Sequence, residues 1–411
     1  MIHYIDQTSE RDHHMVFNSS ILKMLMIMYP NEEIVCHGIL SNQESTKQLL
    51  DSEELKKITF KSIEYTKALS ENKFLKAINY IRKERKRKKL FKELLLTTTQ
   101  KDLIFLSITT FTSFAVFKKL KTKFDVPTIA VLHGDLDFVY NAKTRVEKLI
   151  GSSYKKVFKT KAPNFYYLIL NKISKAYVVN DGYLREDEIF EINHPYNMME
   201  NAVAQKDIFN KKTYSFGHIG SMEVERKNSH FLYVLAERCN RFVTENKISF
   251  QVIGLITPSI LPYKNKWVEE MVGNKQADKP DYLSREDYES KLASLDYSIF
   301  FYDENQYIFR ASGAIIDAIA FTIPFVVLEH PIFNYIFKEA GNVGFKCKDL
   351  EEMENLMQKI IAKDVVILDQ YNNQIANLIE YRKKLSVKYI ADDLEKQLNL
   401  IPSLKNRKTL Q

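Results

Sequence analysis

Short apolar runs of strand length alternate along this sequence with longer stretches that carry apolar residues at helical spacing. This alternation is typical of parallel α/β units, in which a helix follows each strand and crosses back over the sheet. A length of 411 residues exceeds one average domain, and about 150 residues per domain predicts two or three. In the first half, strands are expected at residues 3–5, 33–38, 103–108, 128–133, 176–180 and 189–193.

A second series of the same kind begins after the polar stretch 201–213, which is typical of a linker or an exposed loop. Its expected strands are residues 214–219, 249–254, 297–302 and 324–328, and residues 311–321 have helical period. The sequence therefore predicts an α/β protein with two Rossmann-like doubly wound domains, residues 1–200 and 201–370, which face each other across a cleft.

Composition excludes several classes of protein. Hydrophobic residues make up 45% and charged residues 27%, with 11 Gly and 10 Pro, so disordered and collagen-like chains are excluded. The three cysteines are far apart and form no C-x-x-C pair, which argues against a disulfide framework and a thiolate zinc site and fits a reducing cytoplasm. No segment has the length and apolarity of a signal peptide or a membrane span, so we expect a protein that does not cross a membrane.

The turn after the expected strand 214–219 has the residues that a diphosphate needs. Gly220 and Ser221 are small enough to let backbone N–H groups approach phosphate oxygens, and Arg226 and Lys227 follow closely. A solvated loop with incidental cations is the alternative.

The expected helix at 311–321 provides a second group of candidates. It opens with Arg310, Ser312 and Gly313, so its free N–H groups and positive dipole end are available to an anion. Asp317 lies one turn further along an otherwise apolar helix, where a charge is costly unless it is paired or faces a polar cavity. An interaction with the helix dipole alone is the alternative for Asp317.

These motifs resemble the donor domain of GT-B glycosyltransferases, over roughly residues 214–361. In that family a Gly-containing turn precedes Arg or Lys residues that hold the sugar-nucleotide diphosphate, and a later helix carries a pattern like E-A-x-A-x-G-x-P-V-V. The sequence from Asp317 to Val326 is similar to this pattern, with Asp in place of Glu and Thr322 or Ile323 where Gly is usual. The resemblance implies a donor site without a metal or cofactor, made by Gly220, Ser221, Arg226, Lys227, Arg310, Ser312, Gly313 and Asp317.

One departure from the family pattern leaves the stereochemistry open. Retaining members often have a second glutamate eight residues before the first, and Phe309 occupies that position here. The paired-glutamate signature is therefore absent, and both the retaining and the inverting outcome remain open.

Polar residues in the first half suggest the acceptor side. His133 and Asp135 follow the strand 128–133, where they can supply a general base or hydrogen bonds to a sugar, and we predict both as catalytic. A helix-capping Asp beside a packed His is the alternative, and Asp135 with Asp137 matches the D-x-D metal motif of GT-A enzymes without the rest of that pattern. His13 and His14 precede the first long helix and are acceptor-side candidates.

The densest positive charge lies at Arg82–Lys92, in a chain whose net charge is +8. A basic helix that runs into an apolar patch is suited to the surface of an anionic membrane. A solvated helix face is the alternative, and nucleic acid is not expected because no accompanying nucleic-acid-binding motif is present.

Together these features predict a cytoplasmic glycosyltransferase of the hexosyltransferase class that moves a sugar from a nucleotide-sugar to a glycan or lipid-linked acceptor. The resemblance implies that residues 1–200 bind the acceptor, that residues 201–370 bind the donor, and that helices in 371–411 return to the first domain. A nucleotide-sugar epimerase of the same fold would need no acceptor. A basic scaffold that binds membrane or nucleic acid would have no saturable affinity for nucleotides.

Overall fold

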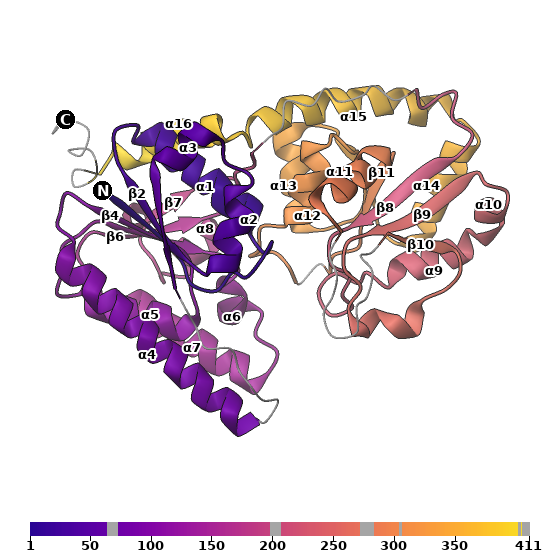
Figure 1. Cartoon of the computed structure of the whole chain (residues 1–411). Coiled ribbons are helices and arrows are strands. Elements are labelled where there is room, and N and C mark those ends of the chain that lie inside the picture. Colours follow the sequence, from indigo (N-terminus) through magenta and orange to yellow (C-terminus); the bar gives the residue numbers. More distant parts are fainter. Residues whose placement is uncertain (64–72, 198–206, 272–282, 304–305, 402–403, 405–411) are drawn as a thin grey trace. The chain divides into compact units, whose positions relative to one another are not determined.

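The computed structural model describes residues 1–63, 73–197, 207–271, 283–303, 306–401 and 404 (Figure 1). The chain divides into two compact units. The first contains Met1–Asn197, Phe309–Ala311 and Leu385–Gln411, and the second contains Met198–Ile308 and Ser312–Lys384. The expected domain boundary at residue 200 lies outside the described residues, and the C-terminal return occurs at Leu385 rather than at 371.

The first unit is built on a seven-stranded sheet with the order β3-β2-β1-β4-β5-β6-β7, in which all neighbours are parallel. The chain moves outward from β1 in one direction and, from β4, in the other. The carboxyl ends of β1 and β4 therefore form the switch point at which doubly wound sheets bind ligands. The strands are β1 (Ile2–Asp6), β2 (Ile34–Gly38), β3 (Ile58–Ser62), β4 (Leu103–Ile108), β5 (Thr128–Leu132), β6 (Phe165–Ile169) and β7 (Ile189–Glu191).

Helices cover both faces of this sheet, with α1, α2 and α16 on one face and α4, α5 and α7 on the other (Figure 1). Because both faces are covered, β1, β2 and β5 are buried along their whole length. The helices are α1 (Met15–Met28), α2 (Leu40–Lys47), α3 (Ser52–Lys56), α4 (Lys73–Thr97), α5 (Phe111–Lys121), α6 (Leu136–Tyr140), α7 (Arg145–Lys159), α8 (Lys172–Asn180), the short 3₁₀ turn Glu186–Glu188 and α16 (Val387–Leu398).

The second unit repeats the same topology in a six-stranded parallel sheet with the order β10-β9-β8-β11-β12-β13. Its switch point lies at the carboxyl ends of β8 and β11. The strands are β8 (Tyr214–Ile219), β9 (Ile248–Ile253), β10 (Val268–Met271), β11 (Tyr297–Phe300), β12 (Phe325–Leu328) and β13 (Gly344–Cys347). The helices are α9 (Phe231–Arg238), α10 (Asn240–Thr244), the 3₁₀ turn Pro258–Tyr263, α11 (Arg285–Ser294), α12 (Gly313–Ala320), α13 (Pro331–Ala340), α14 (Leu350–Ile361) and α15 (Val365–Lys383).

One expected strand is wrong. Residues 176–180 form the second half of α8, which Asn171 starts by accepting a hydrogen bond from the backbone N–H of Ser174 at 2.8 Å. Ser174 and Val178 are buried four residues apart, as one face of a helix requires. A short apolar run such as Tyr-Val-Val does not distinguish a strand from a buried helical turn.

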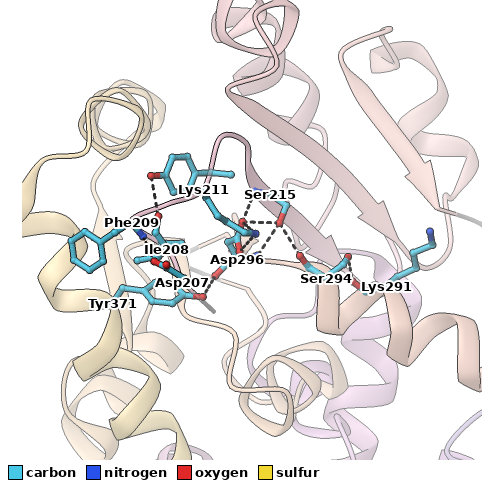
Figure 2. Close-up of polar contacts among 10 residues, drawn as sticks. Asp207, Ile208, Phe209, Lys211, Ser215, Lys291, Ser294, Asp296 and Tyr371 are labelled. Carbon is cyan, nitrogen blue, oxygen red and sulfur yellow. Dashed lines mark hydrogen bonds and ion pairs between the residues drawn. The ribbon is translucent and has the colours of Figure 1, made fainter. Parts of the chain in front are cut away.

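The chain enters β8 through a buried ion pair at the amino end of the sheet (Figure 2). Asp296, which is fully buried, accepts hydrogen bonds from Lys211 Nζ at 2.5 and 2.7 Å and from the backbone N–H of Ser215 at 2.9 Å. Tyr371 of α15 donates to the backbone carbonyl of Asp296 at 3.4 Å. This network joins the start of β8, the residue before β11 and helix α15. It lies at the edge of the sheet opposite the switch point, so we assign it a role in the stability of the second unit.

Candidate functional site

The turn after β8 is tightly packed and includes the expected Gly220 and Ser221. Gly220 has φ +84°, and a Cβ there would lie 3.2 Å from the Cβ of Ala314 on α12. Gly254 at the end of β9 has φ +144°, and a Cβ there would clash with the Gly220 carbonyl. Gly220 therefore lets the turn after β8 lie directly against the start of α12, and Gly254 lets the end of β9 lie against that turn.

Lys227 is held against this turn. It is 6% exposed, and its ammonium donates to the carbonyl oxygen of Ser221 at 2.9 Å and to Ser221 Oγ at 3.2 Å. The ammonium also lies 5.6 Å from the centre of the Tyr307 ring, within cation–π range. The structure therefore places a buried positive charge at the carboxyl end of β8.

Arg226 lies beside it and is more exposed. Its guanidinium donates to Glu223 Oε2 at 2.8 Å, and its backbone carbonyl accepts from the N–H of Asp303 at 3.2 Å. The second contact ties the β8 turn to the residues that follow β11.

Helix α12 begins next to this turn. Ser312 caps it by accepting from the backbone N–H of Ile315 at 3.3 Å, and its hydroxyl also lies 2.7 Å from that of Tyr302. Gly313 is exposed, and among the described residues no atom lies within 4 Å of where its Cβ would be. The Ile315 N–H is thus capped by Ser312, and the positive end of the α12 dipole lies at the exposed Gly313.

Asp317 lies on α12 and has a hydrogen-bond donor on a neighbouring helix. The hydroxyl of Tyr288 on α11 donates to Asp317 Oδ2 at 2.8 Å. The cost of a carboxylate on an apolar helix is thus offset by a direct hydrogen bond as well as by the dipole.

Thr322 occupies the position at which the resembling pattern has glycine. It has φ 51°, in the left-handed region, and is 2% exposed. Its backbone N–H donates to the carbonyl of Ile319 at 3.0 Å. A chain reversal between α12 and β12 explains the usual glycine at this position, and this sequence meets the same requirement with a β-branched residue.

In the first unit, a buried polar network fixes the loop between β1 and α1. Asp6 Oδ1 accepts from the backbone N–H groups of Thr8 and Ser9, both at 3.0 Å. Asn18 donates to Asp6 Oδ2 at 2.7 Å and to Asn42 Oδ1 at 2.9 Å. Asn42 in turn donates to the carbonyls of Arg11 and His13, both at 2.7 Å.

This loop brings His13 and His14 to a cluster of four histidines. The His14 ring lies 3.9 Å from that of His13 and 4.7 Å from that of His133, and His133 lies 6.3 Å from His194. Phe17 of α1 packs against both His133 and His194. Four histidines from three separate segments therefore meet at the carboxyl edge of the first sheet.

Burial keeps these imidazoles neutral. It lowers the pKa of His133 to about 3, with further contributions from His194 and Arg310, and lowers the pKa of His194 to about 4. It also lowers the pKa of His13 and, more strongly, that of His14. At neutral pH the cluster can donate and accept hydrogen bonds but carries no positive charge.

His133 and Asp135 are adjacent in sequence but have different surroundings. His133 Nδ1 is buried and has no hydrogen-bond partner among the described residues. Asp135 accepts a hydrogen bond from the hydroxyl of Tyr154 on α7. Burial raises the pKa of the Asp135 carboxyl, and the bond from Tyr154 opposes this increase. His133 therefore has an unused polar atom, whereas Asp135 is engaged with its own fold.

The structure places Arg310 outside the unit that contains the β8 turn. It belongs to the first unit, where its guanidinium donates to Asp137 and its side chain lies against Gly134. Of the expected donor-side residues, the structure thus brings together Gly220, Ser221, Arg226, Lys227, Ser312, Gly313 and Asp317.

Sequence reasoning missed several residues of these two sites. Tyr288 lies on a helix with no motif, and Asn18 is hidden within an apolar helix. Asn18 could have been predicted to form a buried hydrogen bond, since a polar residue inside a run of buried apolar residues needs a partner. His194, which follows β7, also belongs to the histidine cluster.

Two further observations concern metals and membranes. Within the described residues, no group of three or more His, Cys, Asp or Glu side chains is arranged to hold a metal ion. None of the helices described here has the length and apolarity needed to pass through a membrane.

Comparison with known proteins extends the fold assignment. No family model and no curated protein sequence matches the chain. Among solved structures, it is similar to TarM, with 17% identity and a TM-score of 0.54, covering 78% of this chain and 58% of that one. It is also similar to the lipopolysaccharide outer core galactosyltransferase WaaB, with 13% identity, a TM-score of 0.57 and coverage of 97% and 99%.

A third structure is WaaG, described as a glycosyltransferase involved in lipopolysaccharide biosynthesis, with 10% identity, a TM-score of 0.58 and coverage of 98% and 100%. Identities this low establish the fold and nothing more. The structural matches and the two parallel sheets together show that the chain has the GT-B fold of two Rossmann-like domains.

Proposed function

We propose that this protein is a glycosyltransferase that moves a hexose from a nucleotide-diphosphate sugar to a hydroxyl of a glycan or lipid-linked acceptor in surface polysaccharide synthesis. The observation that carries the proposal is the position of Lys227, a buried ammonium fixed on the turn after β8, in the same unit as the N-terminus of α12 and its exposed Gly313. WaaB and WaaG, which share the fold, are described as acting in lipopolysaccharide synthesis, and this supports the class of acceptor.

The proposed reaction follows from these charges. The acceptor oxygen forms a bond to the anomeric carbon of the sugar, the bond from that carbon to the diphosphate breaks, and the proton of the acceptor hydroxyl passes to solvent water. The diphosphate departs with an additional negative charge. Lys227, Arg226 and the first N–H groups of α12 offset that charge, so the reaction needs no metal ion.

The first unit is proposed to bind the acceptor. His133 has a buried, unpartnered Nδ1 and a pKa of about 3, so it is suited to hydrogen-bonding a sugar hydroxyl rather than to accepting a proton. We assign Asp135, through its bond to Tyr154, to holding the loop that carries His133. His13 and His14 line the same edge.

Helix α4 is proposed to contact an anionic membrane at the cytoplasmic face, where a lipid-linked acceptor would lie. Six of its cations are exposed, namely Arg82, Arg85, Lys86, Lys88, Lys89 and Lys92. Arg87 is 6% exposed and paired with Glu84, and Phe91, Leu94 and Leu95 pack into the core. The contact would therefore be electrostatic, at about 1 kcal/mol per cation near the surface.

The first experiment is a thermal-shift screen with UDP, GDP, CMP and their common sugars, because a ligand that binds only the folded state raises Tm. One nucleotide is expected to raise Tm selectively. Lys227→Met, which keeps the stem and removes the charge, should abolish most of that increase. Lys247→Ala is the matched control, since Lys247 is exposed and directly precedes β9 at the opposite edge of the same sheet.

The products then separate the classes of function. A transferase consumes the nucleotide-sugar only when an acceptor is present, whereas an epimerase converts it without one. The absence of any Tm increase at millimolar nucleotide, with folded protein confirmed, would contradict the proposal and favour a non-catalytic scaffold.

Membrane contact is tested by co-sedimentation with vesicles that contain or lack phosphatidylglycerol. Binding should require the anionic lipid and weaken with salt, and Lys86→Glu/Lys89→Glu should reduce it more than Lys359→Glu/Lys388→Glu does. An equal loss of vesicle binding in the two variants would show that α4 is not the membrane-binding element.

A further inference from the structure

Tyr288 and Asp317 form a polar pair between α11 and α12. The Tyr288 hydroxyl donates to Asp317 Oδ2 at 2.8 Å, and both side chains are half-buried. We infer that Tyr288 is a positioning residue, whose hydroxyl holds the Asp317 carboxylate in the orientation that binds the ribose hydroxyls of the nucleotide. This inference rests on the proposed function.

The place of Asp317 on α12 points toward the nucleotide. Residues three and four apart share one face of a helix, so Asp317 lies above Ala314 and Gly313. Ala314 lies against Gly220, and Gly313 opens the helix at the anion site. A ribose is joined to its diphosphate through the 5′ carbon, so a nucleotide whose diphosphate binds at Gly313 can bring its ribose hydroxyls to Asp317, one helical turn along α12.

The chemistry of the pair fits a vicinal diol. An ionised carboxylate accepts at about four positions and donates at none. Tyr288 uses one of the positions on Oδ2, and two neighbouring ribose hydroxyls are donors that a carboxylate accepts together. A carboxylate that turned freely would lose conformational entropy when it bound the diol, and a hydrogen bond formed beforehand removes part of that loss.

Tyr288 is itself held in place before any ligand binds. The guanidinium of Arg285 lies 5.7 Å from the centre of the Tyr288 ring, within cation–π range. Arg285 also pairs with Glu289 one turn further along α11. The ring is therefore supported from its own helix, as a residue that orients another must be.

The test is a thermodynamic cycle that combines a change in the protein, Tyr288→Phe, with removal of the ribose hydroxyls from the ligand. The nucleoside diphosphate that gives the largest Tm increase and its 2′,3′-dideoxy analogue are titrated calorimetrically into the unaltered protein and into Tyr288→Phe. On the unaltered protein, removal of both hydroxyls should weaken binding about tenfold, since hydrogen bonds to a charged group are lost. In Tyr288→Phe, removal of the same two hydroxyls should weaken binding less than about threefold, because the Asp317 carboxylate is no longer oriented.

The control is Tyr233→Phe. Tyr233 in the same unit also donates to a carboxylate at 2.8 Å, that of Glu270 on the edge strand β10. Its loss should leave the tenfold preference for the ribose unchanged. Asp317→Asn, which keeps the shape of the side chain, should reduce the preference as Tyr288→Phe does and guards against a folding defect in one variant.

The outcomes distinguish this inference from the proposed function. If the unaltered protein prefers the ribose nucleotide and Tyr288→Phe keeps the full preference, the positioning role is wrong and the donor site stands. If no nucleoside diphosphate binds the unaltered protein, the proposed function fails and the positioning role fails with it.

Discussion

At the scale of single residues, Thr322 is the position where the chain most visibly departs from what its backbone prefers. Its φ of 51° is rare for a β-branched residue, and its buried hydroxyl has no hydrogen-bond partner among the described residues. Left-handed backbone costs about 1–2 kcal/mol for a residue with a Cβ and almost nothing for glycine.

Thr322→Gly should therefore stabilise the second unit by about 0.5–1 kcal/mol, after the larger entropy of glycine in the unfolded chain is subtracted. Thr322→Ala is the control, because it removes the hydroxyl and keeps the Cβ that causes the strain. Urea denaturation should place Thr322→Gly above Thr322→Ala in the free energy of unfolding. The reverse order would show that side-chain packing, rather than backbone strain, dominates at this position.

At the scale of elements, the buried ion pair before β8 makes a second prediction. Asp296 is fully buried, and it receives Lys211 and the backbone N–H of Ser215. Asp296→Asn leaves the Lys211 ammonium without its anion and presents an amide group where an acceptor is needed. Because Lys211 is partly exposed and can turn toward water, we expect a loss of about 2–3 kcal/mol, below the usual cost of breaking a buried pair.

The matched control is Asp392→Asn, which breaks an exposed Asp–Lys pair within α16. Exposed pairs of this kind contribute about 0.5 kcal/mol or less, so the two variants should differ severalfold in urea-induced unfolding. Similar losses in both would mean that the Asp296 network contributes no more than a surface contact.

Elements also show how far the sequence determines this fold. Strands 103–108 and 214–219 are confirmed with the same bounds, and the apolar run of the first is bordered by Asp102 and Thr109. Strand β3 was missed because only Ile58 of its five residues is buried, and an edge strand gives no continuous apolar run. The candidate residues after β8 and at the start of α12 were chosen from local order along the chain, whereas Tyr288 and the Asp6–Asn18–Asn42 network depend on contacts between distant segments.

At the scale of the whole molecule, the two units differ in how many histidines have a pKa that burial lowers. In the first unit burial lowers the pKa of His3, His13, His14, His37, His133 and His194, and in the second it lowers that of His218 and His230. Below pH 6.5 these histidines are therefore protonated in the unfolded chain while they remain neutral in the folded units. The unfolding free energy falls as the pH falls toward the folded-state values, which are about 4 for His37 and about 3 for His218.

Acid should consequently destabilise the first unit more steeply than the second, since each fully buried histidine contributes up to about 1.4 kcal/mol per pH unit. The single tryptophan, Trp267, belongs to the second unit, so its fluorescence follows that unit, whereas far-UV ellipticity follows both. Between pH 7.5 and pH 5, the ellipticity midpoint should move to lower temperature faster than the fluorescence midpoint. His37→Gln should reduce the pH-dependent shift of the ellipticity midpoint and leave that of the fluorescence midpoint unchanged. His218→Gln should reduce the shift of the fluorescence midpoint. Two midpoints that move together at every pH would mean that the units unfold as one cooperative body.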